Sequence, residues 1–183
     1  MSVPDEQLML SYAGGDAGAF EALYGRHKGA LFRYVLRSVK ARGEAEELFQ
    51  EIWMRVIESR VRYRAEAKFT TWLYTIAHNR LVDHWRAKGL ALVSLDDEDA
   101  STPEPVAAPD AEPHRNAEAR ETLERLAAAI AALPLAQREA FLLHSESGLT
   151  VAEIAAATGS GEEAAKSRLR YAMNKLREAL GDE

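Results

Sequence analysis

The sequence predicts an all-α protein made of two small helical domains joined by an acidic, proline-rich linker. Apolar residues recur at spacings of three and four in both halves of the chain, and no long run alternates with period two. Pro and Gly are nearly absent from the interiors of these segments, as expected of helices. The length of 183 residues allows one medium domain or two small ones, and the 47% hydrophobic content is typical of a globular chain.

The middle of the chain differs from both flanks. Residues 89–117 contain four of the six prolines and seven acidic residues against a single Arg. A segment of this composition buries too little apolar surface to offset the entropy lost on ordering, so we expect a flexible linker. The expected organisation is a first domain at residues 1–88, the linker at 89–117 and a second domain at 118–183.

The helices expected in each domain follow from these periodic segments. In the first domain they cover residues 4–13, 16–40, 44–60 and 69–87. In the second domain they cover residues 116–132, 135–147, 150–157 and 161–180. The last two form a predicted helix-turn-helix, because Thr150 with Glu153 and Ser160 with Glu163 each have the spacing of a capping box, and a tight turn at Gly159 separates them.

The formal net charge of −6 argues, as a total, against nucleic acid as a partner, since phosphate binding needs positive charge. Its distribution leads to the opposite prediction. The first domain carries +3, the linker −6 and the second domain −3, and two segments, 60–88 and 164–177, each carry +5. We therefore expect two local surfaces that bind nucleic acid.

The first basic segment interleaves cations with aromatic residues, a combination that holds unpaired bases by stacking and by hydrogen bonds to their edges. Within it Tyr74 and Trp85 are expected in the core. Tyr63 is expected outside the core, because it lies in the basic loop that follows residue 60.

The second basic segment is the helix at 161–180, with one apolar face and one face of residues that read bases and hold phosphates. A solvated amphipathic helix is the alternative. The helix at 44–60 has a stripe of acidic residues with one Met, which suits docking onto a basic protein surface, and a merely exposed acidic face is an equally good interpretation.

Other function classes find little support. The chain has no Cys, no apolar stretch of about 20 residues and no secretion signal at its N-terminus, so a soluble cytoplasmic protein without membrane insertion is expected. It has no phosphate-binding Gly-rich loop or nucleophile motif, and His78 and His84 are wrongly spaced for a metal pair on one helix. We expect neither enzyme activity nor a metal or other cofactor.

Four segments together resemble the extracytoplasmic-function (ECF) family of bacterial RNA polymerase sigma factors. The segments are Phe20-Glu-Ala-Leu-Tyr24, Ala45-Glu-Glu-Leu-Phe-Gln-Glu51, Phe69-Thr-Thr-Trp-Leu-Tyr-Thr-Ile-Ala-His-Asn-Arg80, and Gly148 to Ala155 followed by Ala165-Lys-Ser-Arg-Leu169. The resemblance implies a factor that binds core polymerase and directs promoter-specific initiation, typically of a stress- or signal-responsive set of genes.

The resemblance also implies a role for individual residues. The polymerase clamp and β flap would be partners, the clamp being bound by Glu47, Gln50, Glu51 and Met54. The minus-ten element would be melted and held by Tyr63, Arg64, Lys68, Trp72, Ile76, Asn79 and Arg80. The minus-thirty-five element would be read by Lys166, Ser167, Arg170, Tyr171 and Asn174.

Further implications are an anti-sigma factor as a partner and a linker that threads into polymerase. The sequence departs from the family pattern at Ala65, where Gly is usual, at His144, where Arg is common, and at Glu162 and Glu163, which replace uncharged residues.

Two other classes of protein remain open from the residues alone. A DNA-binding regulator would use the second domain on duplex DNA and would not need the acidic stripe. An all-helical adaptor would have basic faces that are merely solvated, and would show no salt-dependent DNA binding.

Overall fold

The computed structural model describes residues 2–39, 41–90 and 117–181 of the chain. This part contains no strand and consists of eight α-helices and one 3-10 helix. The helices are α1 (Asp5–Ala13), α2 (Ala17–Ser38), α3 (Arg42–Ser59), η1 (Arg60–Arg62), α4 (Phe69–Ala87), α5 (Ala117–Ala131), α6 (Leu135–Ser147), α7 (Val151–Thr158) and α8 (Glu162–Leu180). The predicted all-α class is confirmed, while the predicted linker lies mostly outside the described residues.

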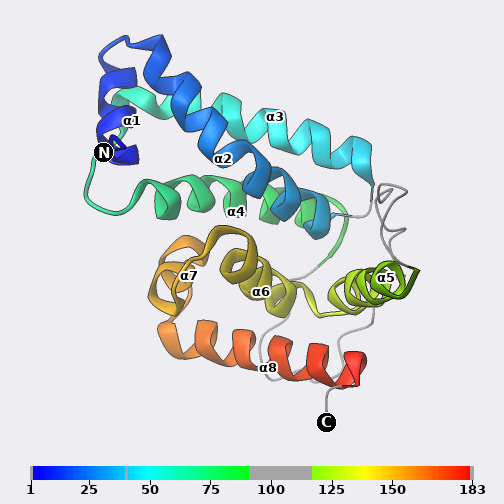
Figure 1. Ribbon diagram of the computed structural model, residues 1–183. Helices are drawn as coiled ribbons and strands as arrows, with labels where there is room; N and C mark the ends of the chain where they lie inside the picture. The colour runs from blue at the N-terminus through cyan, green and yellow to red at the C-terminus, as the bar shows by residue number, and fades with distance from the viewer. Residues whose placement is uncertain (1, 40, 91–116, 182–183) are drawn as a thin grey trace.

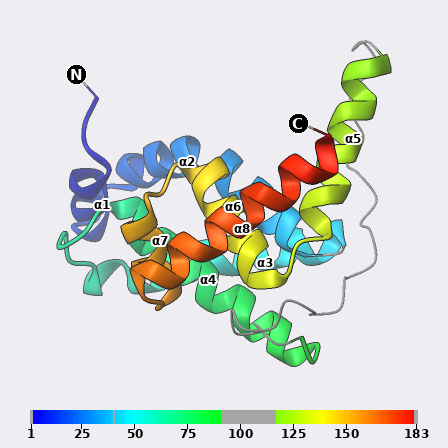
Figure 2. The same ribbon diagram turned by 90° about the horizontal axis from the view of Figure 1, so that it is seen from below.

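The helices lie in two layers, α1 to α4 above and α5 to α8 below in Figure 1. We call residues 2–90 the N-terminal lobe and residues 117–181 the C-terminal lobe. Seen from below, α8 crosses in front of the other helices, and one end of α5 extends beyond them (Figure 2).

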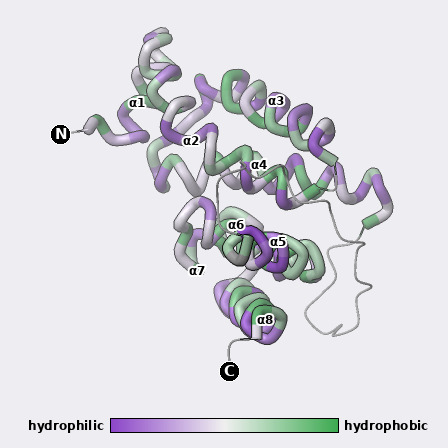
Figure 3. The backbone as a smooth tube through the Cα atoms, turned by 45° about the vertical axis from the view of Figure 1, so that its right-hand side comes forward, coloured by the Kyte–Doolittle hydropathy of each residue, from purple (hydrophilic) through white to green (hydrophobic). Residues whose placement is uncertain are grey.

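The N-terminal lobe is built on α2, whose first turn is capped by Asp16. The carboxylate of Asp16 accepts hydrogen bonds from the backbone N–H groups of Gly18 and Ala19 at 2.9 and 3.3 Å. Helix α3 packs against α2 through a face in which Leu48, Ile52 and Val56 are buried. The helix therefore buries one apolar face, and Figure 3 shows hydrophobic and hydrophilic stretches alternating along it.

In the C-terminal lobe the predicted capping box of α7 is confirmed. Thr150 Oγ1 accepts from the Glu153 N–H at 3.3 Å, and a Glu153 carboxylate oxygen accepts from the Thr150 N–H at 2.8 Å. The helix ends at Thr158, and its C-cap Gly159 has a φ of 62°, a left-handed conformation that glycine adopts without strain.

The second predicted capping box, from Ser160 to Glu163, is wrong. Gly161 is the N-cap of α8, and no side chain caps that helix. A capping box requires the acidic residue at the third position of the helix. Because the extended Gly161 is the N-cap, Glu163 is only the second helical residue. The Ser160 hydroxyl lies instead 3.0 Å from the Thr158 hydroxyl.

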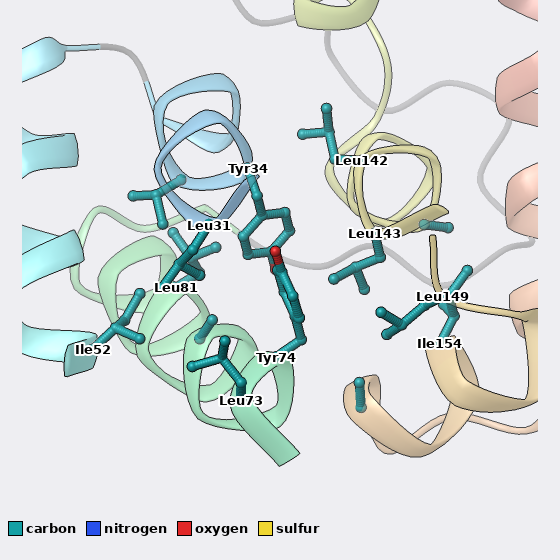
Figure 4. Packing of buried hydrophobic residues seen from close by; sticks show 14 of the residues in the cluster. Leu31, Tyr34, Ile52, Leu73, Tyr74, Leu81, Leu142, Leu143, Leu149 and Ile154 are labelled. Carbon is teal, nitrogen blue, oxygen red and sulfur yellow. The ribbon is translucent and has the colours of Figure 1, made fainter. Parts of the chain in front are cut away.

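The two lobes share one continuous core. Helix α6 packs on α2, and α7 packs on α4. Figure 4 shows Tyr34 and Tyr74 of the upper layer facing Leu142, Leu143 and other apolar side chains of the lower layer. All four of these residues are 0–1% exposed. The chain therefore has a closed arrangement, in which α4 and the first helix of the helix-turn-helix are in direct contact.

Candidate functional site

The acidic stripe on α3 forms a continuous exposed surface. All four residues predicted to bind polymerase line one open hollow, together with Arg55 and Glu58; the four are Glu47, Gln50, Glu51 and Met54. The Met54 side chain is 53% exposed, which is unusual for a large apolar residue. The hollow thus combines carboxylates with a flexible apolar side chain, as a docking surface for a basic helical partner requires.

The face of α4 next to this hollow carries the residues predicted to hold the minus-ten element. Asn79 is exposed, while Trp72, Ile76 and Arg80 are half-buried. Arg64 and Lys68 are exposed on the loop that precedes α4. These six side chains therefore follow one path from the loop along α4.

Tyr63 departs from the prediction, because its side chain belongs to the core and is 3% exposed. Its ring lies 5.0 Å from the ring of Trp72, edge to face, and 6.4 Å from that of Phe69. Burial, together with the nearby carboxylates of Glu6 and Asp5, raises the pKa of Tyr63 to about 12. Tyr63 therefore packs against Trp72 from within the core. The expected core positions of Tyr74 and Trp85 are confirmed.

An ion pair joins the two predicted surfaces of the N-terminal lobe. The Arg80 guanidinium on α4 contacts the Glu51 carboxylate on α3, and this hydrogen bond lowers the pKa of Glu51. This pair could not be predicted from the sequence, because its members lie 29 positions apart on different helices. Any partner that engages Glu51 must compete with Arg80 for it.

Helix α8 presents its predicted polar face to solvent. Lys166, Arg170 and Asn174 are exposed, Tyr171 is 41% exposed and Ser167 is half-buried. The Arg170 guanidinium lies 5.3 Å from the centre of the Tyr171 ring, a cation–π contact that orients both side chains. The opposite face is buried through Ala165, Ala172 and Leu176.

The structure also places the four residues that depart from the family pattern. Ala65 is exposed in the loop before α4, and Glu162 and Glu163 are exposed in the first turn of α8. His144 Nδ1 lies 3.0 Å from the Leu149 carbonyl oxygen, so this ring is tied to the turn between α6 and α7.

A row of three acidic residues lies between the lobes, and the sequence carries no local signal for it. Glu139, Glu146 and Glu153 of the C-terminal lobe all contact polar or cationic groups of the N-terminal lobe. Glu139 is the most buried, at 4% exposure. Its Oε1 accepts from the Tyr34 hydroxyl at 2.9 Å and lies 2.6 Å from His78 Nδ1.

The other two carboxylates of this row lie nearer the surface. Glu146 contacts Arg33, at 2.7 Å, and Arg37. Glu153, the capping residue of α7, pairs with Lys68 at 2.7 Å. One of the cations predicted to bind promoter DNA is thus engaged by the helix-turn-helix in the closed arrangement.

Within residues 2–39, 41–90 and 117–181 there is no helix long and apolar enough to cross a membrane. The same residues contain no group of three or more His, Asp or Glu side chains that could hold a metal ion.

Removing the cap of α7 gives a direct test of the helix-turn-helix geometry. We expect Thr150→Ala to lower the free energy of unfolding by about 1 kcal/mol, because the Glu153 N–H loses its acceptor at the N-terminus of a short helix. Urea denaturation measures this, with Ser145→Ala at an exposed position of α6 as the control. Equal stability of the two variants would contradict the capping assignment.

Together, the bundle of α1 to α4, the helix-turn-helix of α7 and α8, and their charged faces define a helical DNA-binding protein. Comparisons with known proteins identify the family. Residues 23–90 match the Sigma-70 region 2 model, and residues 123–176 match the Sigma-70, region 4 model.

Relatives that match over nearly the whole chain include two sigma factors. The RNA polymerase sigma factor CarQ of Myxococcus xanthus is 32% identical over 174 residues, which is 95% of this chain and 96% of CarQ. The ECF RNA polymerase sigma factor SigL of Mycobacterium tuberculosis is 32% identical over 171 residues, 92% of each chain.

Solved structures agree with the sequence relatives. The sigma factor RpoE of Bartonella quintana, determined in complex with the anti-sigma factor NepR, has a TM-score of 0.72 and 26% identity, covering 90% of this chain and 98% of RpoE. CnrH, determined with the cytosolic domain of CnrY, shares the fold at a TM-score of 0.70 and 23% identity, covering 98% of this chain and 99% of CnrH. The chain belongs to the ECF RNA polymerase sigma factors, which direct transcription initiation by RNA polymerase.

Proposed function

We propose that this sigma factor binds the clamp of core RNA polymerase through α3, captures the minus-ten element with α4 and its preceding loop, and reads the minus-thirty-five element with α8. The observation that carries the proposal is the set of three separate faces, each with a surface chemistry suited to its partner. The chain itself contributes binding energy and no catalytic group, and it acts in the cytoplasm, where polymerase and promoter DNA are found.

The hollow on α3 supports the first assignment. Glu47 and Gln50 are exposed and make no hydrogen bond or ion pair within the described part of the chain. Their polar groups and the exposed Met54 are therefore free for a partner. The β flap would bind the C-terminal lobe, so that polymerase contacts both ends of the chain.

The face of α4 supports the second assignment. Trp72 and Ile76 offer apolar surface, Asn79 offers an amide that can bond a base edge, and Arg64 and Arg80 offer charge for phosphates. A flipped base would stack on the aromatic cluster, and this captured state would stabilise the melted strand.

The exposed face of α8 supports the third assignment. Lys166 and Arg170 can reach guanine edges or phosphates in the major groove, Ser167 and Asn174 can bond base edges, and Tyr171 can contact the backbone. The apolar face of α8 holds the helix on the rest of the lobe, so the polar face is presented rigidly.

The closed arrangement would have to open before the chain can act on a promoter. The minus-ten and minus-thirty-five elements are separated by about 25 base pairs, as their names state, which is about 85 Å along the DNA. In the closed arrangement, by contrast, the Lys68 ammonium next to α4 lies 2.7 Å from the Glu153 carboxylate of α7. We therefore assign the closed form to the resting protein. An anti-sigma factor, such as the one bound to RpoE, would hold or replace this closed form.

The proposal is tested by run-off transcription with core RNA polymerase on a promoter library. The wild-type chain should initiate at a specific subset of promoters. Gln50→Ala/Glu51→Ala should initiate at least tenfold less at limiting protein concentration, because it loses two groups of the α3 hollow. A companion variant, Glu47→Lys, reverses a charge that has no partner within the described part of the chain and leaves the Glu51–Arg80 pair intact.

Glu21→Lys is the matched control, because it makes the same charge reversal at an exposed position of α2 away from the hollow. It should initiate like the wild type. Failure of the wild type at every promoter would overturn the proposal. Duplex DNA binding by the chain alone, with no effect of either α3 variant on transcription, would favour a regulator that never contacts polymerase.

A further inference from the structure

Helix α1 lies outside the part of the chain that matches the Sigma-70 region 2 model, which begins at residue 23. It nevertheless contacts one element assigned to minus-ten recognition, since it packs on the start of α4 as well as on α2 and η1. Met9 on its inner face is fully buried. The helix is therefore built into the lobe next to the loop that precedes α4.

One side chain of α1 forms a hydrogen bond with the backbone of α4. Glu6 Oε1 accepts a hydrogen bond from the Phe69 N–H, the first backbone donor of α4, at 2.6 Å. The N-cap residue of α4 is Lys68, whose own side chain makes no capping bond. Glu6 therefore supplies, from 63 residues earlier in the chain, the cap that the local sequence lacks. Its negative charge also faces the positive end of the helix dipole.

Further contacts fix Glu6 and the loop. Asp5 pairs with Arg26 at 2.6 Å and lies 2.7 Å from His27, which anchors the N-terminus of α1 on α2. At the other end of α1 the Arg60 guanidinium lies over the Tyr12 ring. The loop between residue 60 and α4 is thus held at its start by Tyr12 and at its end by Glu6.

The aromatic cluster transmits this constraint to the proposed base-binding face. Phe69, whose N–H is capped, has its ring 5.9 Å from that of Trp72, and Tyr63 contacts both rings. A shift of the first turn of α4 would therefore move Trp72 and the basic loop together.

We infer that Glu6 is a positioning residue for promoter melting: by capping α4 it fixes the loop and Trp72 in the geometry that captures an unpaired minus-ten base. This inference rests on the proposed role of α4. It adds a residue of α1 that does not itself touch DNA.

The test uses the complete protein assembled with core polymerase and a fluorescent single-stranded minus-ten oligonucleotide from a promoter that the wild type transcribes. Glu6→Ala should bind this strand about fivefold more weakly, the effect of losing one cap. Glu6→Gln should bind like the wild type, because its amide oxygen can still accept from the Phe69 N–H. Affinity for core polymerase should be unchanged in both.

Asp16→Ala is the matched control, because it removes the cap of α2 in the same lobe. It should lower stability to a similar extent and leave the strand affinity intact. Equal strand affinities of Glu6→Ala and wild type, or equal losses in Glu6→Ala and Asp16→Ala, would overturn the inference. Failure of the wild-type holoenzyme to bind the strand would instead overturn the proposed role of α4.

Discussion

Replacing Glu139 with alanine should separate the two lobes. Its carboxylate is the acceptor shared by the Tyr34 hydroxyl and His78, which lie on two different helices of the N-terminal lobe. Burial and the neighbouring Glu139 raise the pKa of Tyr34 well above its usual value, so this hydroxyl stays protonated and needs an acceptor. The variant leaves both polar groups buried without their partner.

The size of the effect follows from the burial of these groups. An unsatisfied buried donor costs roughly 1–3 kcal/mol, so the closed form should lose about 3 kcal/mol relative to an open form in which both groups are hydrated. This loss corresponds to a shift of roughly 150-fold in the equilibrium between closed and open forms. The pairs of Glu146 with Arg33 and Arg37 would remain, and raising the salt concentration should weaken them further.

The absence of cysteine from the chain makes the measurement simple, because two introduced cysteines can carry a pair of dyes. Gly25→Cys on α2 and Lys175→Cys on α8 place them at exposed positions of the two lobes. Energy transfer should fall in Glu139→Ala, and it should be retained in Glu139→Gln, whose amide oxygen still accepts.

Glu163→Ala, at an exposed position of α8, is the control for loss of a carboxylate from the same lobe. It should leave the energy transfer unchanged. If Glu139→Ala shows the same transfer as this control at low and high salt, the carboxylate does not hold the lobes closed.

The helices and the charged faces of α3 and α8 could be predicted from the sequence, because they depend on residues close together in the chain. The apolar spacing of α3 and α8 fixes which side is buried, and it therefore fixes which polar residues share the other side. The capping box at Thr150 is likewise local, with donor and acceptor three residues apart.

What the sequence could not predict depends on contacts between distant segments. Tyr63 follows a basic 3-10 turn, and its burial results from the approach of α1 and α4. The contacts of Glu139 with Tyr34 and His78 join residues 105 and 61 positions apart, and both cross the linker. The spacing of apolar residues does not show that Glu139 is buried; only the packing of α6 on α2, which brings the carboxylate within reach of Tyr34 and His78, makes it an acceptor between the lobes.

Replacing Arg170 with alanine should weaken promoter recognition at the minus-thirty-five element more than any other single change on α8. Its guanidinium is exposed at the centre of the polar face and is held by the Tyr171 ring at 5.3 Å, so little freedom remains to be lost on binding. A bidentate contact of such a group with guanine is worth about 1–3 kcal/mol.

The expected result is a loss of roughly 5- to 150-fold in holoenzyme affinity for duplex DNA that contains the minus-thirty-five element. Arg170→Lys should recover only part of this, because an ammonium group cannot form the planar two-point contact. Lys175→Ala removes a cation about 140° around the same helix from Arg170 and is the matched control; it should lose much less affinity than Arg170→Ala.

Titration at several salt concentrations separates the two kinds of contact that Arg170 can make. If Arg170 reads a base, the alanine variant should lose discrimination between promoter and mutated minus-thirty-five sequences while the salt dependence stays nearly constant. If it holds a phosphate, affinity should fall equally for both sequences and the slope of log affinity against log salt should decrease by about one. Unchanged affinity and slope in Arg170→Ala would remove this residue from the interface and move recognition to the side of the face formed by Lys166 and Ser167.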